Sequence, residues 1–183
     1  MTYKFVNFIR DLDRVNRKRK KEKWVNIYTN QDFINISTRS GLRGSVADRD
    51  QKGVYLPLDV SNLELGQHLR EALSLSRAMD PACSKDLDLY FSDIERHHKW
   101  VESVMKRFKY KTKGAVFKPM THCSVILCNN KITLYSWHQC KLQAWEGIES
   151  IEASIIIVPK SCADEELGEA AHTAILQCTS VWS

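Results

Sequence analysis

Residues 121–137, THCSVILCNNKITLYSW, decide the fold of this chain. The runs 121–128 and 131–137 are rich in β-branched, aromatic and other apolar residues, as strands are. Asn129 and Asn130 separate the two runs, and asparagine tolerates the positive φ angles of a two-residue hairpin turn. The stretch therefore predicts an antiparallel hairpin, around which the rest of the chain can be arranged.

Strand-like runs also occur on both sides of this hairpin, each bounded by turn-forming residues. We expect strands at 23–29, 32–38, 54–60 and 151–159. The last of these is apolar enough to be a central strand. Residues 39–53 hold three of the seven glycines and many charges, so they are expected to form an exposed loop.

The other segments place apolar residues at three- and four-residue spacing, which predicts helices. The expected helices cover 3–15, 63–79, 92–108, 112–117 and 161–178. Ser61 or Asn62 is expected to cap the second of them. Ser92 and Glu95 match a capping box for the third, and Ser161 is expected to cap the last.

These elements predict a single α+β domain over residues 1–183, with an antiparallel or mixed sheet covered by about three main helices. A chain of 183 residues with 43% hydrophobic residues is long enough to bury one core. No apolar run approaches the roughly 20 residues of a membrane helix, and the N-terminus lacks the apolar region of a secretory signal. We therefore expect a cytoplasmic protein whose six cysteines are free thiols.

Basic residues are concentrated near the N-terminus. In RVNRKRKKEKW, residues 14–24, seven of eleven residues are Lys or Arg. Residues 1–24 carry nine basic and three acidic side chains, a net +6, which leaves 18 basic and 19 acidic residues, a net −1, elsewhere. A nucleic-acid-binding fold usually spreads its basic surface over the folded body. Nucleic-acid binding through residues 14–23 is therefore the alternative function, and a solvated segment is the simpler interpretation.

The sequence lacks the short motifs of common enzyme classes. The nucleophile elbow G-x-S-x-G, the phosphate loop G-x-x-x-x-G-K-[ST] and the dinucleotide motif G-x-G-x-x-G do not occur. We therefore expect neither an enzyme nor a cofactor.

Two groups of histidines and cysteines are candidate metal ligands. His97 and His98 are adjacent, so their side chains diverge by about 100° on a helix, and surface histidines are expected. The second group lies in and just after the predicted hairpin and consists of His122, Cys123, Cys128, His138 and Cys140. These residues lack the C-x-x-C spacing that zinc sites usually show. No metal site is expected.

Several segments, taken in order, resemble one protein family. The helix LELGQHLREALSLSR (63–77) directly follows VYLPLDVSN. After it come DIERHHKWVESVMKRFKYKTKGAVFKPM (93–120), KLQAWEGI (141–148), SIIIVP (154–159) and ADEELGEAAHTAILQC (163–178). This pattern resembles the CdiI family, the immunity proteins of bacterial contact-dependent growth inhibition systems. The resemblance covers about residues 53–179 and leaves out the basic run.

The resemblance implies a protein that binds and neutralises the C-terminal toxin domain of a cognate CdiA effector, without catalysis. Such toxins are often nucleases that cut tRNA or DNA, so a nuclease domain is the expected partner. A nuclease presents a cationic groove to phosphates, so an inhibitor often offers carboxylates there. The two acidic clusters that qualify are Asp86, Asp88 and Asp93 before a helix, and Glu146, Glu149 and Glu152 around Trp145.

Other parts of the chain are further candidates for toxin recognition. Trp145 is interpreted as a core residue in preference to a binding anchor, because its surrounding motif recurs in the family. The loop 39–53 and the first 50 residues remain open as specificity elements, because variable surfaces carry toxin specificity in this family.

Overall fold

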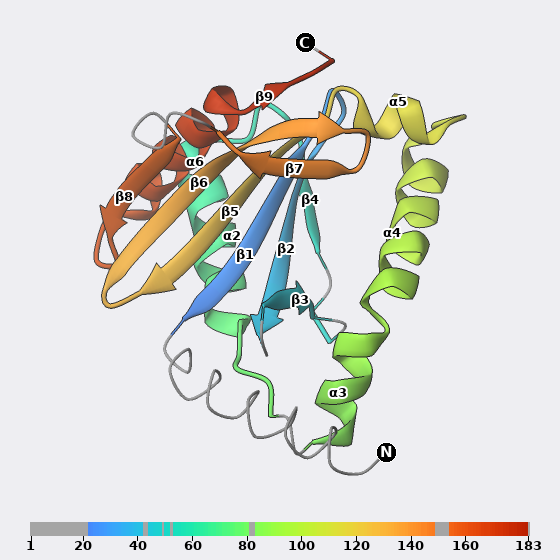
Figure 1. Cartoon of the computed structure of the whole chain (residues 1–183). Coiled ribbons are helices and arrows are strands. Elements are labelled where there is room, and N and C mark those ends of the chain that lie inside the picture. Colours follow the sequence, from blue (N-terminus) through green and yellow to red (C-terminus); the bar gives the residue numbers. More distant parts are fainter. Residues whose placement is uncertain are drawn as a thin grey trace.

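One curled, largely antiparallel sheet organises the fold (Figure 1). The computed structural model describes residues 22–41, 44–48, 50–51, 53–80, 83–148 and 154–182. The sheet order is β3-β2-β1-β5-β6-β7, with β4 added to β2 and with β8 and β9 added to β6. The strands are β1 (Lys23–Thr29), β2 (Ile34–Gly41), β3 (Ser45–Ala47), β4 (Val54–Leu56), β5 (Thr121–Cys128), β6 (Lys131–Lys141), β7 (Ala144–Gly147), β8 (Ile155–Pro159) and β9 (Thr179–Ser180).

Three main helices accompany this sheet, as the α+β prediction requires. They are α2 (Asn62–Leu75), α4 (Asp93–Phe108) and α6 (Asp164–Gln177), with the shorter α3 (Ser84–Phe91) and α5 (Lys113–Phe117). None of the helices in the described ranges is long and apolar enough to cross a membrane.

The predicted hairpin is confirmed. Strands β5 and β6 pair antiparallel up to Cys128 and Lys131, and Asn129 and Asn130 have φ angles of 48° and 61°. Strand β6 then continues beyond the predicted end to Lys141, and the chain turns back into β7. The long β6 is therefore the strand on which β7, β8 and β9 are assembled.

The two faces of the sheet are covered differently. Side chains alternate along β1, so Val25 and Ile27 point to one face while Asn26 and Tyr28 point to the other. Helices α2 and α6 pack on the Val25 face, where Leu65, Leu69 and other apolar residues complete the main core. In Figure 1 these two helices lie behind the sheet, and α3 and α4 stand to its right.

Helices α2 and α6 touch backbone to backbone. A Cβ added to Gly66 would lie 1.7 Å from the carbonyl oxygen of Asp164, and one added to Gly168 would lie 1.8 Å from that of Asn62. Only glycine, which has no Cβ, allows this approach. Arg70 of α2 fixes the contact by donating hydrogen bonds to the Asp164 carboxylate at 2.5 Å and to the backbone of the preceding turn.

A second, smaller core holds α4 and α5 against the opposite face of the sheet. It contains Phe33, Val101, Val104, Val116, Phe117 and Met120. The predicted helix at 112–117 is confirmed as α5, and the Thr112 hydroxyl caps it by accepting a hydrogen bond from the backbone N–H of Ala115 at 3.1 Å. Helix α4 is thus anchored at its C-terminal end.

Helix α2 ends earlier than predicted, at Leu75 instead of Met79. Its predicted N-cap, Ser61, is confirmed. Ser76 is extended because its hydroxyl accepts from the backbone N–H of Trp24 and donates to the Arg39 carbonyl. These bonds draw the chain onto the sheet edge, and hydrogen bonding to the sheet there replaces the last helical turn.

Two predicted helix caps are wrong. The segment before Ser92, where no helix is predicted above, is helix α3, so the chain reaches Ser92 directly from a helix. The Ser92 hydroxyl donates to the Asp88 carbonyl at 2.7 Å and caps nothing. Helix α6 has Ala163 as its N-cap instead of Ser161.

The predicted loop at 39–53 is partly wrong, because it contains the end of β2 and the short strand β3. The strand expected at 54–60 stops at Leu56. Strand β8 pairs with β6 alone among the described strands, so it lies at an edge and is not central. The helix predicted at 3–15 lies outside the described residues.

Candidate partner-binding cleft

A cleft of about 530 Å³ lies between helix α4 and the sheet face opposite α2 and α6. It lies beside the smaller core, whose apolar side chains pack one end of α4 against the sheet. Strands β1, β2 and β4 supply Tyr28, Arg39 and Tyr55, helix α4 supplies Asp93, Arg96, His97 and Trp100, and the β6–β7 hairpin supplies Gln143 and Trp145.

Stacked aromatic rings support the cleft on the sheet side. Tyr28 of β1 and His122 of β5 are register partners, and their rings stack at 4.7 Å with an interplanar angle of 12°. Trp137 of β6 stacks on the other side of His122 at 5.8 Å. Trp145 meets the His122 ring edge-on at 5.5 Å. This packing gives the cleft a preformed aromatic wall.

Two of these rings, those of His122 and Trp145, carry buried nitrogen atoms without a hydrogen-bond partner in the described part of the chain. Both ring nitrogens of His122 and Nε1 of Trp145 are buried and make no hydrogen bond to any described residue. Burial, reinforced by the charge of Arg39, lowers the pKa of His122 to about 3. At neutral pH the ring is therefore uncharged and offers one donor and one acceptor. Unsatisfied buried groups each cost about 1–3 kcal/mol of stability.

Charged residues fix the shape of the cleft rim. The Arg96 guanidinium donates to the Asp93 carboxylate at 2.9 Å and to the Ala47 carbonyl at 3.0 Å. These bonds join the start of α4 to strand β3. The N-terminal end of α4 is therefore held over the sheet by polar contacts, while its C-terminal end is held by the smaller core.

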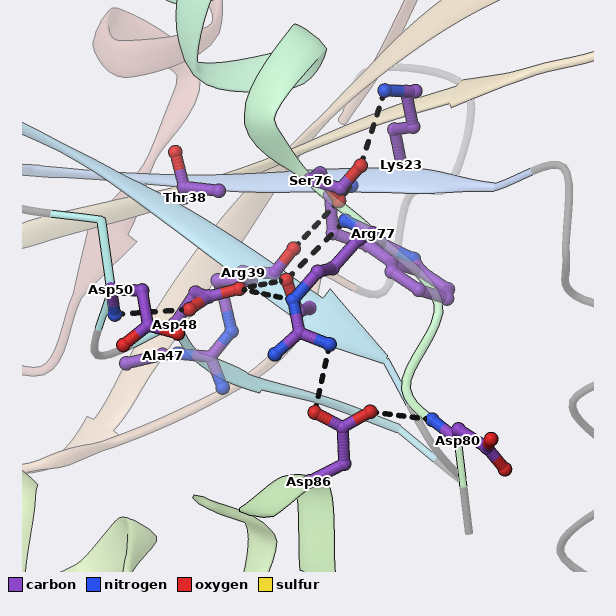
Figure 2. A network of polar contacts seen from close by, with 12 residues as sticks. Lys23, Thr38, Arg39, Ala47, Asp48, Asp50, Ser76, Arg77, Asp80 and Asp86 are labelled. Atoms are coloured by element: carbon purple, nitrogen blue, oxygen red, sulfur yellow. Dashed lines mark hydrogen bonds and ion pairs between the residues drawn. The ribbon is translucent and has the colours of Figure 1, made fainter. Parts of the chain in front are cut away.

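A buried polar network connects the same end of the molecule to helix α2 (Figure 2). Arg77 lies between two carboxylates, with its Nη1 2.8 Å from Asp86 and its Nε 3.4 Å from Asp48. Ser40 donates to Asp48 at 2.5 Å, and the Asp80 backbone N–H donates to Asp86 at 2.7 Å. The network fixes α3 relative to the sheet. Both carboxylate oxygens of Asp86 accept hydrogen bonds within the protein.

The last lysine of the basic run has a structural role. Lys23 Nζ donates to the carbonyl oxygens of Ser74 and Ser76 at 2.7 and 3.1 Å. A cation at these orphan carbonyls stabilises the C-terminal end of α2. Residues 14–21, which carry the rest of the run, lie outside the described residues.

The six predicted toxin-contact residues do not gather at one place. Asp93 lines the cleft, Asp88 is exposed on α3, Glu146 is exposed on β7, and Asp86 is buried in the Arg77 network. Glu149 and Glu152 lie outside the described residues. Trp145 packs against the smaller core, as interpreted from the sequence, and it also lines the cleft.

Sequence reasoning missed the aromatic wall. Alternation along each strand could have grouped Tyr28 with Asn26 on one face of β1, and His122 with Ser124 on one face of β5. Nothing local indicated that β1 pairs with β5, which are about 90 residues apart, and this pairing brings the rings together.

The histidines and cysteines weighed as metal ligands are dispersed. Both His97 and His98 are exposed, and a ring nitrogen of His97 lies 3.0 Å from the Gln143 side-chain oxygen. Cys123 is buried on the α6 side, whereas His122 is on the cleft side. In the described ranges, no three His, Cys, Asp or Glu side chains are arranged to share a metal ion. All six cysteines are free thiols.

A family model and a known relative both match this chain over most of its length. The family model for CdiI, described as CDI immunity protein, matches residues 23–178. The immunity protein CdiI-YPIII of Yersinia pseudotuberculosis serotype O:3 is 32% identical over 170 residues, which are 86% of this chain and 96% of that protein.

Two solved structures share the fold. One chain of the CdiA-CT/CdiI toxin and immunity complex from Yersinia pseudotuberculosis superposes with a TM-score of 0.80 and 32% identity, covering 87% of this chain and 98% of that one. A Neisseria meningitidis protein of unknown function, NMB0488, superposes with a TM-score of 0.81 and 27% identity over 87% of this chain and 96% of that one.

Proposed function

The chain belongs to the CDI immunity protein family, and we propose that it binds a CdiA-CT toxin domain and protects the cell that makes it. CDI immunity proteins are toxin inhibitors and not enzymes. The observation that carries the proposal is the 32% identity over 170 residues to the Yersinia immunity protein, together with the matching chain of a toxin and immunity complex.

We propose that the toxin is a nuclease that acts on tRNA or DNA, and that binding takes place in the cytoplasm, where those substrates are. Exposed carboxylates support this choice, because a phosphate-binding groove attracts them. Asp88 on α3 and Glu146 on β7 are the exposed members of the two acidic clusters, and Asp93 lies at the cleft.

The cleft is the proposed toxin-binding site. Its aromatic wall offers large rigid surfaces, which dominate the binding energy of many interfaces. Tyr28 and Trp145 line the cleft directly, and His122 supports both rings from outside the lining. A partner seated in the cleft would therefore pack against rings that are already held in place.

Binding can be tested with the toxin domain encoded immediately upstream of this gene. We expect the two proteins to co-elute from a size-exclusion column, and cells expressing both to survive induction of the toxin. Failure of co-elution, or death of cells that express this chain, would contradict the proposal.

The site can be tested separately with matched tryptophan variants. Trp145→Ala is expected to weaken toxin affinity by about 30-fold or more, as loss of an interface anchor does. Trp182→Ala is the control, because Trp182 is exposed and contacts Lys118 away from the cleft. The toxin affinity of Trp145→Phe, which keeps a ring and removes the N–H, should lie between those of wild type and Trp145→Ala. Equal affinities for the two alanine variants would place the interface elsewhere.

A further inference from the structure

Two cysteine sulfurs meet where helix α6 ends against the sheet. The sulfur of Cys123, on β5, lies 3.4 Å from that of Cys178, the residue that follows the last turn of α6. Both side chains are free thiols. The Cys178 thiol also lies 3.1 Å from the His122 carbonyl oxygen, to which it can donate. The two sulfurs are therefore within reach of each other without rearrangement of the fold.

The two thiols differ in their access to solvent. Cys123 is fully buried in the main core. Cys178 is partly exposed and lines a surface pocket of about 150 Å³, together with Lys118, Met120, Thr179 and Trp182. A small reagent can therefore approach Cys178 from this pocket, whereas Cys123 does not line it.

The two thiols also differ in acidity. Donation of the Cys123 S–H to the Cys178 sulfur lowers the pKa of Cys178, in opposition to burial. The same hydrogen bond, followed by burial, raises the pKa of Cys123. Cys178 is thus the one that reacts as thiolate, and Cys123 keeps its proton.

We propose that Cys178 and Cys123 form a peroxide-reactive dithiol, in which Cys178 reacts first and Cys123 then closes a disulfide. In the first step the Cys178 thiolate attacks a hydroperoxide oxygen, the O–O bond breaks, and hydroxide leaves. Cys178 becomes a sulfenic acid, oxidised by two electrons, and the peroxide is reduced. In the second step the Cys123 thiol attacks the Cys178 sulfur, the S–S bond forms, and water leaves with the Cys123 proton. The sum is two thiols and hydrogen peroxide giving one disulfide and two waters.

Closing the bond requires only a local movement. The sulfurs must approach from 3.4 Å to about 2.05 Å. Cys178 is extended and lies outside the regular helix, so its side chain can move while the α6 ladder stays intact. The product would tie the end of α6 covalently to β5. This inference does not depend on the proposed toxin-binding function.

Reduced full-length protein treated with hydrogen peroxide at neutral pH tests the proposal. We expect intact-mass analysis to show a loss of about 2 Da that dithiothreitol reverses. Trypsin alone leaves Cys162 and Cys178 in one peptide, 161–183, so digestion with a Glu-specific protease should follow. Because Cys123 and Cys128 also share a tryptic peptide, 114–131, the experiment should be repeated with Cys128→Ser. A Cys123–Cys178 cross-link in both proteins supports the proposal.

Single variants separate the two steps. In Cys123→Ser we expect the sulfenic acid of Cys178 to persist and to be trapped by dimedone, whereas Cys178→Ser should form no disulfide. Oxidation of Cys128 or Cys140 while Cys178 remains available for alkylation would overturn the proposal. So would a cross-link between any other pair. If a variant does not fold, judged by its thermal melt, the wild-type mapping alone decides.

Discussion

Arg77 donates a 2.8 Å hydrogen bond to Asp86 and so joins the segment after helix α2 to helix α3. The Asp86 side chain is only 8% exposed, whereas the neighbouring Asp88 is exposed. Two acids that look equivalent in the sequence therefore have different roles. Binding of a toxin through Asp86 would first have to break this internal pair.

Asp86→Asn is expected to destabilise the protein by about 2–3 kcal/mol, because it leaves a partly buried guanidinium with one carboxylate instead of two. The value is at the low end for a buried pair because Arg77 is 41% exposed. Chemical denaturation measures the change. Asp88→Asn is the control, and its free energy of unfolding should lie within about 0.5 kcal/mol of the wild-type value.

Charge reversal of the exposed acids tests the proposed nuclease partner. Asp88→Lys and Glu146→Lys should each slow association with the toxin about threefold to tenfold at low salt, and the difference should shrink as salt rises. Stopped-flow or surface plasmon resonance measures the rate. If both variants associate at the wild-type rate, charge attraction at these positions has no part in binding.

His122 predicts a pH dependence of stability. Its pKa in the folded protein, about 3, lies below the ordinary 6.5, so the unfolded chain takes up a proton first as the pH falls. The contribution of the neutral ring is complete above the ordinary pKa and is lost as the pH falls towards 3. Between pH 6 and 4, wild type should lose about 1.4 kcal/mol per pH unit more than His122→Phe.

Unfolding free energies measured across that range decide the question. His97→Gln, which removes an exposed histidine, should keep the wild-type slope. Parallel curves for wild type and His122→Phe would mean that His122 is not held neutral by burial.

The contact between α2 and α6 should not tolerate a side chain. Gly66→Ala would place a Cβ 1.7 Å from the Asp164 carbonyl oxygen, and backbone must move to relieve this overlap. We expect a loss of about 3 kcal/mol or more, or failure to fold. Gly147→Ala, where no atom lies within 4 Å of the added Cβ, should leave the melting temperature nearly unchanged.

The alternative function, nucleic-acid binding by the basic run, can be tested more sharply with the structure. Replacing the basic residues of 14–21 with Gln while keeping Lys23 removes charge without removing the contacts of Lys23 with α2. We expect toxin neutralisation to be unchanged. Wild-type binding to polynucleotide that falls steeply with salt, and that disappears in this variant, would instead favour the alternative.

Local sequence patterns predicted individual helices and strands better than they predicted the contacts between them. The two asparagines and the flanking apolar runs predicted the hairpin, because a two-residue turn depends on nearby chemistry. The capping box predicted for Ser92 was wrong, because the role of this residue depends on whether the preceding residues are already helical. The aromatic wall could not be predicted, because it depends on the pairing of β1 with β5, which only the tertiary structure fixes.

The backbone contact between Gly66 and Asp164 also has a practical consequence. It lies on the side of the sheet away from the cleft, where spacing is set by main-chain atoms and no side chain can be exchanged to adjust it. The protein is therefore divided into a scaffold that must be copied unchanged and a surface that can be redesigned. An engineer seeking immunity to a different toxin could randomise the cleft side in a library and leave the helix pair untouched.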